Sequence, residues 1–185
     1  MLGKIITSFI DLIHSKHDEA FVDDLISSLQ LDNDGAYTDF IIYDDDDLFK
    51  LTNAYITKTG RCYSDVWKEF GIYSFKSLYE QHGHITKKYT SLLSVMNNLD
   101  SSIHPALDLM YDDIRFPQFK VIESNASSTT IAYSSQRNLV DFAEGLIRGC
   151  ALYFDGDICL SKLDTAIFDE PFNAVFKIDL DEGAQ

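Results

Sequence analysis

The sequence feature that most constrains the fold is a change in hydrophobic periodicity near the middle of the chain. In the first half, apolar residues recur at helical spacing, as in Ile5, Ile6, Phe9, Ile10 and Ile13. This spacing puts them on one side of a helix, so we expect a helix over about residues 3–17. The same pattern predicts further helices over 21–31, after the acidic run 44–47, from residue 64, and over 86–99.

In the second half, apolar and polar residues alternate with a period of two, which is typical of strands. Segments 117–123 and 129–133 predict two strands joined by a turn, and a helix is expected over 138–154. Segments 158–163 and 174–180 predict two more strands. The expected fold is therefore α+β, a helical N-terminal layer packed on a C-terminal antiparallel sheet with a helix.

Length, charge and cysteine content limit the number of domains, the kinds of partner and the cellular location to be expected. A chain of 185 residues, 45% of them hydrophobic, suits one domain with a real core. Its formal net charge of -15 argues against nucleic acid and anionic membrane surfaces as partners. No signal peptide is recognisable, and no apolar run reaches the roughly eighteen residues of a membrane span. With three widely separated cysteines, a reduced cytoplasm is the expected location.

Tyr133, Ser135 and Arg137 form the sharpest polar pattern. On a strand, residues two apart point to the same side at intervals of about 7 Å, so these three would form a row of donors. The planar guanidinium of arginine can bind a carboxylate with two hydrogen bonds. The row therefore suits a carboxylate ligand, although on its own it is better explained as chance alternation at a solvent-facing strand.

A second feature is a single histidine among apolar neighbours. His104 lies in the segment Ile103-His104-Pro105-Ala106-Leu107. A neutral imidazole is a good axial ligand for heme iron, but a lone histidine is more often a core residue. A porphyrin needs one axial base, donors for its propionates and apolar residues on both faces, so the two features together favour heme. Because proline is tolerated only in the first turn of a helix, His104 is expected near a helix start or a kink.

In their order and spacing, these features resemble the heme-nitric oxide/oxygen binding (H-NOX) family, bacterial relatives of the heme domain of soluble guanylate cyclase. The resemblance runs from Met1-Leu2-Gly3 through the segment 65–71 (DVWKEFG) to the Tyr-x-Ser-x-Arg strip. It implies one domain over 1–185, with a helical N-terminal subdomain over about 1–62. The heme-ligating helices, the sheet and the rest would span about 63–185, with heme b buried between the two parts.

The resemblance assigns roles residue by residue. His104 is the axial ligand of the heme iron, and the propionates are bound by Tyr133, Ser135 and Arg137. The residues that press on the porphyrin and bend it are Ile5, Pro117 and Leu146. Such packing is physically sensible, because a ring held off-planar by a close-packed wall stores strain that a change in iron ligation can release.

The gas preference follows from the residues that match the distal pocket, Phe9, Ser74 and Phe142. Bound dioxygen is held well only where a hydrogen-bond donor points at it. In oxygen-binding members that donor is a tyrosine at the position of Phe142, which offers no hydroxyl. Nitric oxide binds ferrous iron without a donor. The resemblance therefore implies a sensor of nitric oxide, with carbon monoxide as a second ligand.

The resemblance also implies how the signal leaves the protein. The iron-histidine bond lengthens or breaks, the heme relaxes, and the helical layer moves against the rest as a two-state switch. The chain is expected neither to be an enzyme nor to contain an output domain. The expected partner is a separate sensor histidine kinase or cyclic-di-GMP enzyme.

Three alternatives stay open. A dioxygen sensor needs a distal donor from another position, for which Tyr73 and Ser74 are candidates. A heme-free redox switch would use Cys62, Cys150 or Cys159. An acidic interaction module would keep the fold without heme.

The clusters of acidic residues and of histidines predict a turn, a helix cap and surface positions, and not metal sites. The run 32–35 (DNDG) does not match a calcium loop and predicts a turn, and the run 44–47 predicts a solvated helix cap. The pairs His14/His17 and His82/His84 lack a third ligand and predict surface histidines. No histidine follows His104 and only two cysteines do, so no zinc site of one histidine and three cysteines is expected.

Overall fold

A computed structural model describes residues 1–31, 33–111, 114–154 and 156–181. Its helices and strands follow one another in the order α1 (Gly3–His14), α2 (Glu19–Ser27), α3 (Asp45–Thr59), α4 (Tyr63–Gln81), α5 (Gly83–Thr86), α6 (Leu92–Met96), the π-helical turn η1 (Leu99–Ile103), α7 (His104–Asp108), β1 (Gln118–Ser124), β2 (Ser128–Ser134), α8 (Val140–Tyr153), β3 (Ile158–Leu163), the 3₁₀ turn η2 (Thr165–Ile167) and β4 (Ala174–Leu180). None of the described helices is long and apolar enough to cross a membrane.

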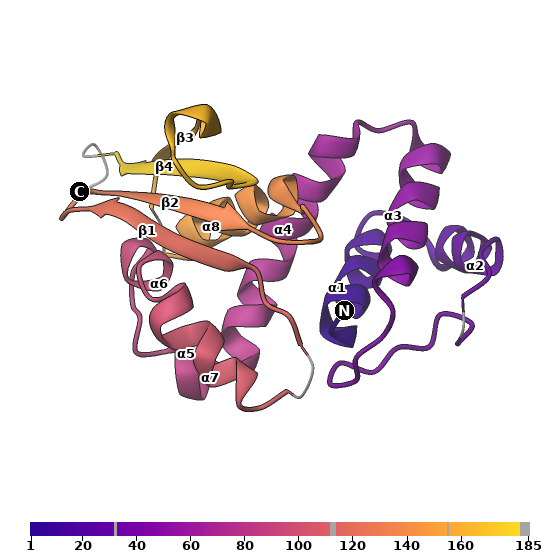
Figure 1. The fold of residues 1–185 in the computed structure, drawn as a ribbon. Coiled ribbons are helices and arrows are strands. Elements are labelled where there is room, and N and C mark those ends of the chain that lie inside the picture. The colour runs from indigo at the N-terminus through magenta and orange to yellow at the C-terminus, as the bar shows by residue number, and fades with distance from the viewer. Residues whose placement is uncertain (32, 112–113, 155, 182–185) are drawn as a thin grey trace.

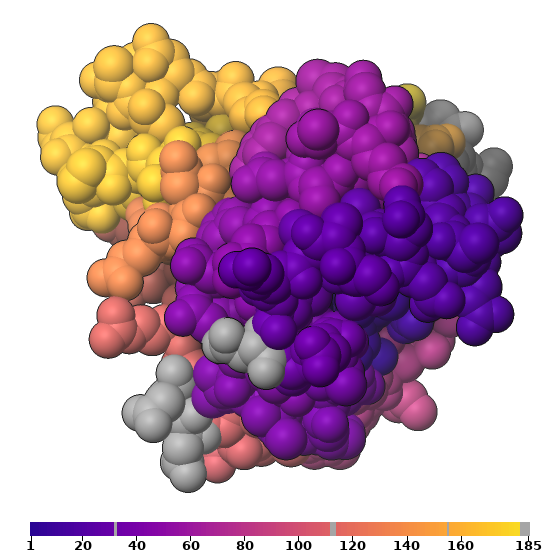
Figure 2. All heavy atoms as spheres, turned by 90° about the vertical axis from the view of Figure 1, so that its right-hand side faces the viewer, coloured from indigo at the N-terminus to yellow at the C-terminus, as the bar shows by residue number. Residues whose placement is uncertain are grey.

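The N-terminal layer consists of α1, α2 and α3 around the first half of α4 (Figure 1). The apolar side of α1 buries Ile6, Phe9 and Ile13 against this core. Asp18 caps α2 by accepting a hydrogen bond from the backbone of Phe21, as expected for an acidic N-cap. These helices form much of the face that Figure 2 turns toward the viewer.

The C-terminal part is a four-stranded antiparallel sheet in the order β1-β2-β4-β3, with α8 packed against it (Figure 1). Strand β2 is central and buries five successive residues, whereas β1 at the edge buries only Phe119. The strands predicted over 158–163 and 174–180 match β3 and β4. The α+β prediction and its order of two strands, a helix and two strands are confirmed.

Helix α4 joins the two parts because it packs along α8 at very short range. A Cβ added to Gly71 would lie 2.3 Å from the carbonyl oxygen of Phe142, and one added to Gly145 would lie 2.2 Å from that of Lys68. Only glycine permits this approach of the two backbones. Residues of α4 contribute to both hydrophobic cores, Trp67 and Phe70 to the N-terminal one and Phe75 and Tyr79 to the other.

The single helix predicted over 86–99 is wrong. The chain there forms α5, α6 and η1 in succession. Thr86 ends α5 with its hydroxyl bonded to the carbonyls of Tyr79 and His82, and the Ser91 hydroxyl starts α6 by capping the backbone of Ser94. Side chains that bond the backbone locally compete with a continuous helix. The first helix also ends earlier than predicted, at His14.

Candidate functional site

A mainly apolar cavity of about 260 Å³ lies between the N-terminal layer and the C-terminal part. Its walls come from the start of α1, the second half of α4, residues within 95–111 and 114–119, the end of β2 and α8. Such a pocket, apolar with a few polar groups, is the usual form of a cofactor site. The residues predicted for heme binding can be located relative to it.

His104 lines the cavity at the first position of α7, directly after η1, so the prediction of a helix start is confirmed. Its Nδ1 lies 3.1 Å from Oδ1 of Asp100, and the ring stacks on Phe116 with centroids 5.1 Å apart. A carboxylate only accepts hydrogen bonds, so neutral His104 carries its proton on Nδ1 and a lone pair on Nε2. Among the described residues, none forms a hydrogen bond with Nε2.

Tyr133, Ser135 and Arg137 all line the same cavity, although not for the reason given by strand alternation. Strand β2 ends at Ser134, and the two later residues lie in the turn that follows. The Asn173 side chain accepts a hydrogen bond from the Ser135 backbone at 2.6 Å, which extends the ordered segment past the strand. Burial raises the pKa of Tyr133, so its hydroxyl keeps its proton and can donate.

Arg137 already binds two oxygen acceptors of the protein. Its Nε donates to Oδ2 of Asp45 at 2.5 Å, and Nη1 donates to the carbonyl of Arg115 at 2.7 Å. Burial would raise the pKa of Asp45, but hydrogen bonds from Arg137 and the N-terminal amine outweigh it and hold the pKa below its usual value. The guanidinium is thereby fixed at the polar edge of the cavity.

The acidic run at the start of α3 is only partly the solvated cap that we expected. Asp44 does cap α3, by accepting a hydrogen bond from the backbone of Asp46. Asp47 is buried and accepts a hydrogen bond from the Tyr37 hydroxyl at 3.0 Å. Asp45 pairs with Arg137, a residue 92 positions later. This pairing could not be found from local sequence pattern.

The three residues predicted to press on the porphyrin, Ile5, Pro117 and Leu146, all line the cavity. Of the three predicted distal residues, only Phe142 does so. Phe9 lies one layer further out, since its ring packs on Phe70 at 4.9 Å and Phe70 packs on Phe142 at 4.7 Å.

The other two positions considered for a distal donor lie outside the cavity lining. The Ser74 hydroxyl is fully buried and has no hydrogen-bond partner among the described residues. Tyr73 is 41% exposed on the outer side of α4. Neither points a proton into the cavity in this structure.

Two hydroxyl groups along the α4 side of the cavity have acceptors in the protein. Tyr79 donates to the carbonyl of Tyr89 at 2.9 Å. Thr86 donates to the carbonyl of Tyr79 at 2.6 Å. Because each hydroxyl has one proton, neither is left to donate to a ligand.

His82 lines the cavity and is 5% exposed, so its assignment to the surface is wrong. Its Nδ1 lies 3.2 Å from the Leu78 carbonyl, and Nε2 lies 2.8 Å from the Tyr111 hydroxyl. Burial lowers the pKa of His82, which keeps it neutral. A carbonyl only accepts, so Nδ1 donates to it and the Tyr111 proton is used on Nε2.

In the part of the chain that the structure describes, the cysteines and the remaining acidic groups form no second site. Cys62, Cys150 and Cys159 are all free thiols, and burial raises the pKa of Cys150 strongly, which suppresses its reactive thiolate. Within the described ranges, no three His, Cys, Asp or Glu residues lie together as metal ligands would.

The fold and the cavity define a class of protein. It is α+β, with an apolar cavity that offers an imidazole nitrogen at one wall and polar donors at one edge. The family model described as Haem-NO-binding matches residues 2–162, and the chain therefore belongs to this family, the H-NOX proteins. Members of the family are heme-based gas sensors.

Solved structures show the same fold over nearly the whole chain. An unliganded Fe(II) H-NOX protein from K. algicida is 24% identical with a TM-score of 0.85, covering 100% of this chain and 99% of that one. An Fe(II)NO H-NOX protein from S. oneidensis is 22% identical with a TM-score of 0.88, covering 98% and 100%. The S. oneidensis domain in its Fe(II)CO state is 21% identical, with a TM-score of 0.85 and coverage of 98% and 99%. A comparison with curated proteins found no match.

Proposed function

We propose that this protein senses nitric oxide at a ferrous heme b ligated by His104 and passes the signal to a separate partner. The observation that carries the proposal is the His104 Nε2 lone pair at the wall of an apolar cavity in which the hydroxyls of Tyr79, Thr86 and Tyr111 all have partners within the protein. Together, an iron ligand and three hydroxyls whose protons are already used within the protein favour a gas that needs no hydrogen bond.

The residues around the cavity fit a heme. The described lining offers apolar side chains for the faces of the ring, an axial base in His104 and a polar edge for the propionates. At that edge, Tyr133 and Ser135 supply hydroxyls, and Arg137 supplies a cation whose direction is fixed by Asp45. Charge-assisted hydrogen bonds from such groups are the strong ones for a carboxylate.

The preference for nitric oxide over dioxygen rests on where the donors are. Phe142 faces the cavity without a hydroxyl, and Tyr111 donates its proton to His82. The S. oneidensis relatives with this fold have been solved with nitric oxide and with carbon monoxide. We therefore propose both gases as ligands, with nitric oxide as the signal.

The heme, when bound, supplies a ferrous iron that takes up the gas. The protein's part is to hold His104 through Asp100 and Phe116, and to press on the ring through Ile5, Pro117 and Leu146. Of these, Ile5 belongs to α1 in the N-terminal layer and His104 belongs to α7. Release of His104 from the iron would let this wall relax and let the N-terminal layer move against the rest.

The domain division and the output are also part of the proposal. We place the boundary of the helical subdomain near residue 62, at the start of α4. The protein would act as a cytoplasmic sensor without catalytic activity of its own. Its partner would be a sensor histidine kinase or a cyclic-di-GMP enzyme, and neither nucleic acid nor a membrane is expected as a partner because of the net charge of -15.

Absorption spectra of the purified ferrous protein test the proposal. We expect a five-coordinate heme that stays unchanged in air and shifts with nitric oxide and with carbon monoxide. His104→Ala should lose heme during purification, and added imidazole should restore it. A stable spectral change in air would show a dioxygen sensor, and heme retained by His104→Ala without imidazole would show another ligand.

A further inference from the structure

We propose that the Asp100 carboxylate is a positioning residue that strengthens the bond between His104 and the heme iron. The inference rests on the proposed function, because it needs His104 to be the iron ligand. It concerns how readily that ligand is released, and hence how easily the gas signal is produced.

Each oxygen of Asp100 has its own donor. Oδ1 accepts from Nδ1 of His104 at 3.1 Å, and Oδ2 accepts from the backbone N–H of Phe119 at 2.5 Å. The second bond joins η1 to strand β1, 19 residues later in the chain. The carboxylate is therefore held between the ligand's helix and the sheet, and it cannot turn away from the imidazole without giving up a bond.

Local structure explains this placement. Asp100 lies four residues before His104, so the two side chains are neighbours on one side of the helical turn. The turn between them is η1, a π-helical turn in which the Ile103 N–H donates to the Asn98 carbonyl at 2.9 Å. Short π-helical turns occur frequently at functional sites. Here the turn places the Asp100 side chain beside that of His104, directly before Pro105.

Partial burial and the lack of a competing ion pair among the described residues leave the Asp100 carboxylate to interact mainly with His104. The His104 side chain is 15% exposed and that of Asp100 is 34% exposed, so water screens their contact only in part. The groove outside Asp100 is also lined by Lys120, whose ammonium is paired with Glu170 at 2.5 Å. No other described side chain forms an ion pair with Asp100.

A carboxylate acceptor on Nδ1 raises the basicity of the opposite nitrogen of the ring. Such outer partners of metal-bound histidine fix the tautomer, and their loss typically changes metal affinity or activity by roughly 10–100-fold. A more basic Nε2 binds iron more strongly and favours the ferric over the ferrous state. Asp100 therefore raises the energy needed to release His104 and sets the threshold of the sensor.

The substitution Asp100→Asn tests the proposal in the heme-loaded protein. Asparagine keeps an oxygen for the Phe119 N–H but removes the negative charge from the imidazole. We expect a lower iron-histidine stretching frequency by resonance Raman spectroscopy and a more complete five-coordinate spectrum with nitric oxide. We also expect a higher midpoint potential, by about 59 mV for each tenfold change in the ferric-to-ferrous preference.

Asp108→Asn is the matched control, because Asp108 lies on α7, the short helix that begins at His104, is exposed, and its substitution changes the net charge equally. It should leave all three measurements unchanged, and Asp100→Glu should restore them in part. If Asp100→Asn retains heme and leaves the stretching frequency and the potential unchanged, Asp100 only anchors β1 and the proposal is overturned.

Nitrogen NMR of the His104 ring in the heme-free protein gives an independent measurement if Asp100→Asn does not hold heme. The proposal expects the proton on Nδ1 in the wild-type protein, and finding it on Nε2 instead would overturn the proposal. If His104→Ala retains a normal heme spectrum, the proposed function itself fails. If only the Asp100 measurements are negative, that function stands.

Discussion

At the scale of single residues, the hydrogen-bond partner of a hydroxyl decides whether its proton can be donated to a bound ligand. The cavity contains several hydroxyls, yet those of Tyr79, Thr86 and Tyr111 all donate to acceptors in the protein. Composition alone would count these groups as possible donors to bound dioxygen. Their geometry removes them, and Phe142 is then the position at which a donor would matter.

Phe142→Tyr is expected to convert the site toward dioxygen binding. The ring faces the cavity and packs on Phe70 at 4.7 Å, so an added hydroxyl would enter the space of the ligand. One hydrogen bond to a partly charged oxygen contributes about 1.4 kcal/mol, or roughly tenfold slower dissociation. Stopped-flow measurement of dioxygen dissociation from the ferrous protein checks this expectation.

Phe116→Tyr is the control for that substitution, because it adds the same hydroxyl on the His104 side of the cavity. It should not slow the loss of dioxygen. Equal slowing by both variants would mean that the added polarity, and not a directed hydrogen bond, stabilises the bound gas.

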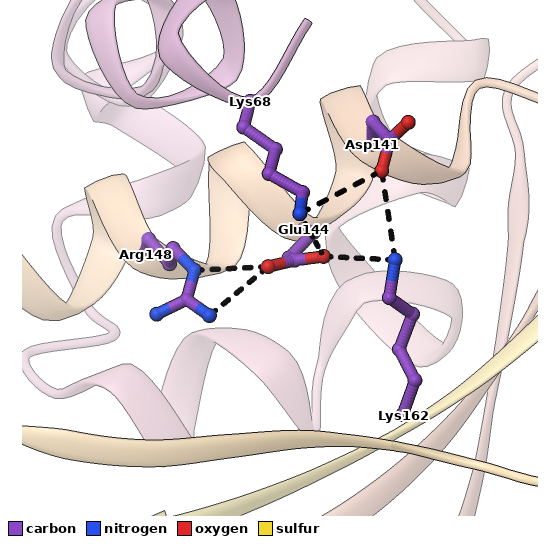
Figure 3. A network of polar contacts seen from close by, with 5 residues as sticks. All are labelled: Lys68, Asp141, Glu144, Arg148 and Lys162. Atoms are coloured by element: carbon purple, nitrogen blue, oxygen red, sulfur yellow. Dashed lines mark hydrogen bonds and ion pairs between the residues drawn. The ribbon is translucent and has the colours of Figure 1, made fainter. Parts of the chain in front are cut away.

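At the scale of elements, α8 is held in place by ion pairs as well as by the glycine contacts with α4. Glu144 of α8 is buried and is surrounded by Lys68 of α4, Arg148 of α8 and Lys162 of β3 (Figure 3). Lys162 lies 3.0 Å from Oε2, and Arg148 lies 3.0 Å from Oε1. Glu144 stands between Phe142 and Leu146 in sequence, so this cluster fixes the rotation of the helix that supplies these two residues to the cavity lining.

The Glu144 cluster predicts a pH dependence of stability. Burial would raise the pKa of Glu144, but the hydrogen bonds from Lys162 and Arg148 outweigh it and the pKa is lowered. A lowered folded-state pKa means stabilisation that is present above the unfolded pKa of about 4.3 and is lost as pH falls through the folded value. Glu144→Gln should therefore lower the free energy of unfolding by about 2 kcal/mol at pH 7, with a difference that shrinks in acid.

Urea denaturation of both proteins in the same heme state, between neutral and acidic pH, measures this difference. Glu170→Gln is the control, because the pair of Glu170 with Lys120 is more than half exposed and contributes little. A loss of stability for Glu144→Gln that stays constant down to pH 3 would show that packing, and not the charge, is what Glu144 contributes.

At the scale of the whole molecule, the cavity exists because two separately packed cores meet there. One core is built from α1 to α3 and the start of α4, and the other from the sheet, α8 and the later helices. Leu146 packs against both. Across this boundary, the Asp45 carboxylate of α3 binds the Arg137 guanidinium after β2. Movement of one layer against the other must stretch or break that pair.

Asp45→Asn is expected to let the two layers separate more easily. The pair is partly buried, with side chains 22% and 32% exposed, so its loss should cost about 1 kcal/mol and speed opening roughly fivefold. Hydrogen exchange of the α1 amides and the rate of heme transfer to a scavenging globin measure the opening.

Asp44→Asn is the control for the loss of charge at this helix end. Asparagine caps a helix as well as aspartate does, so α3 stays intact while the net charge changes equally. Heme transfer that is as fast in Asp44→Asn as in Asp45→Asn would assign the effect to helix α3 and not to the pair with Arg137.

The sequence by itself determined the α+β class, the four strands, and the position of His104 near a helix start or a kink. These follow from hydrophobic period and from Pro105, which act over a few neighbouring residues. The ordered spacing of His104, Pro117 and Tyr133 was also sufficient to indicate the family that the comparisons then showed.

Only the tertiary structure decided which polar groups line the cavity and which partners they bind. Tyr133, Ser135 and Arg137 share it although the strand ends before the last two, and Phe9 lies behind Phe142 despite its predicted place beside it. The Asp45–Arg137 pair and the Asp100–Phe119 bond join residues 92 and 19 positions apart. A local pattern reports which face a side chain occupies, but its partner across the fold depends on how the layers pack.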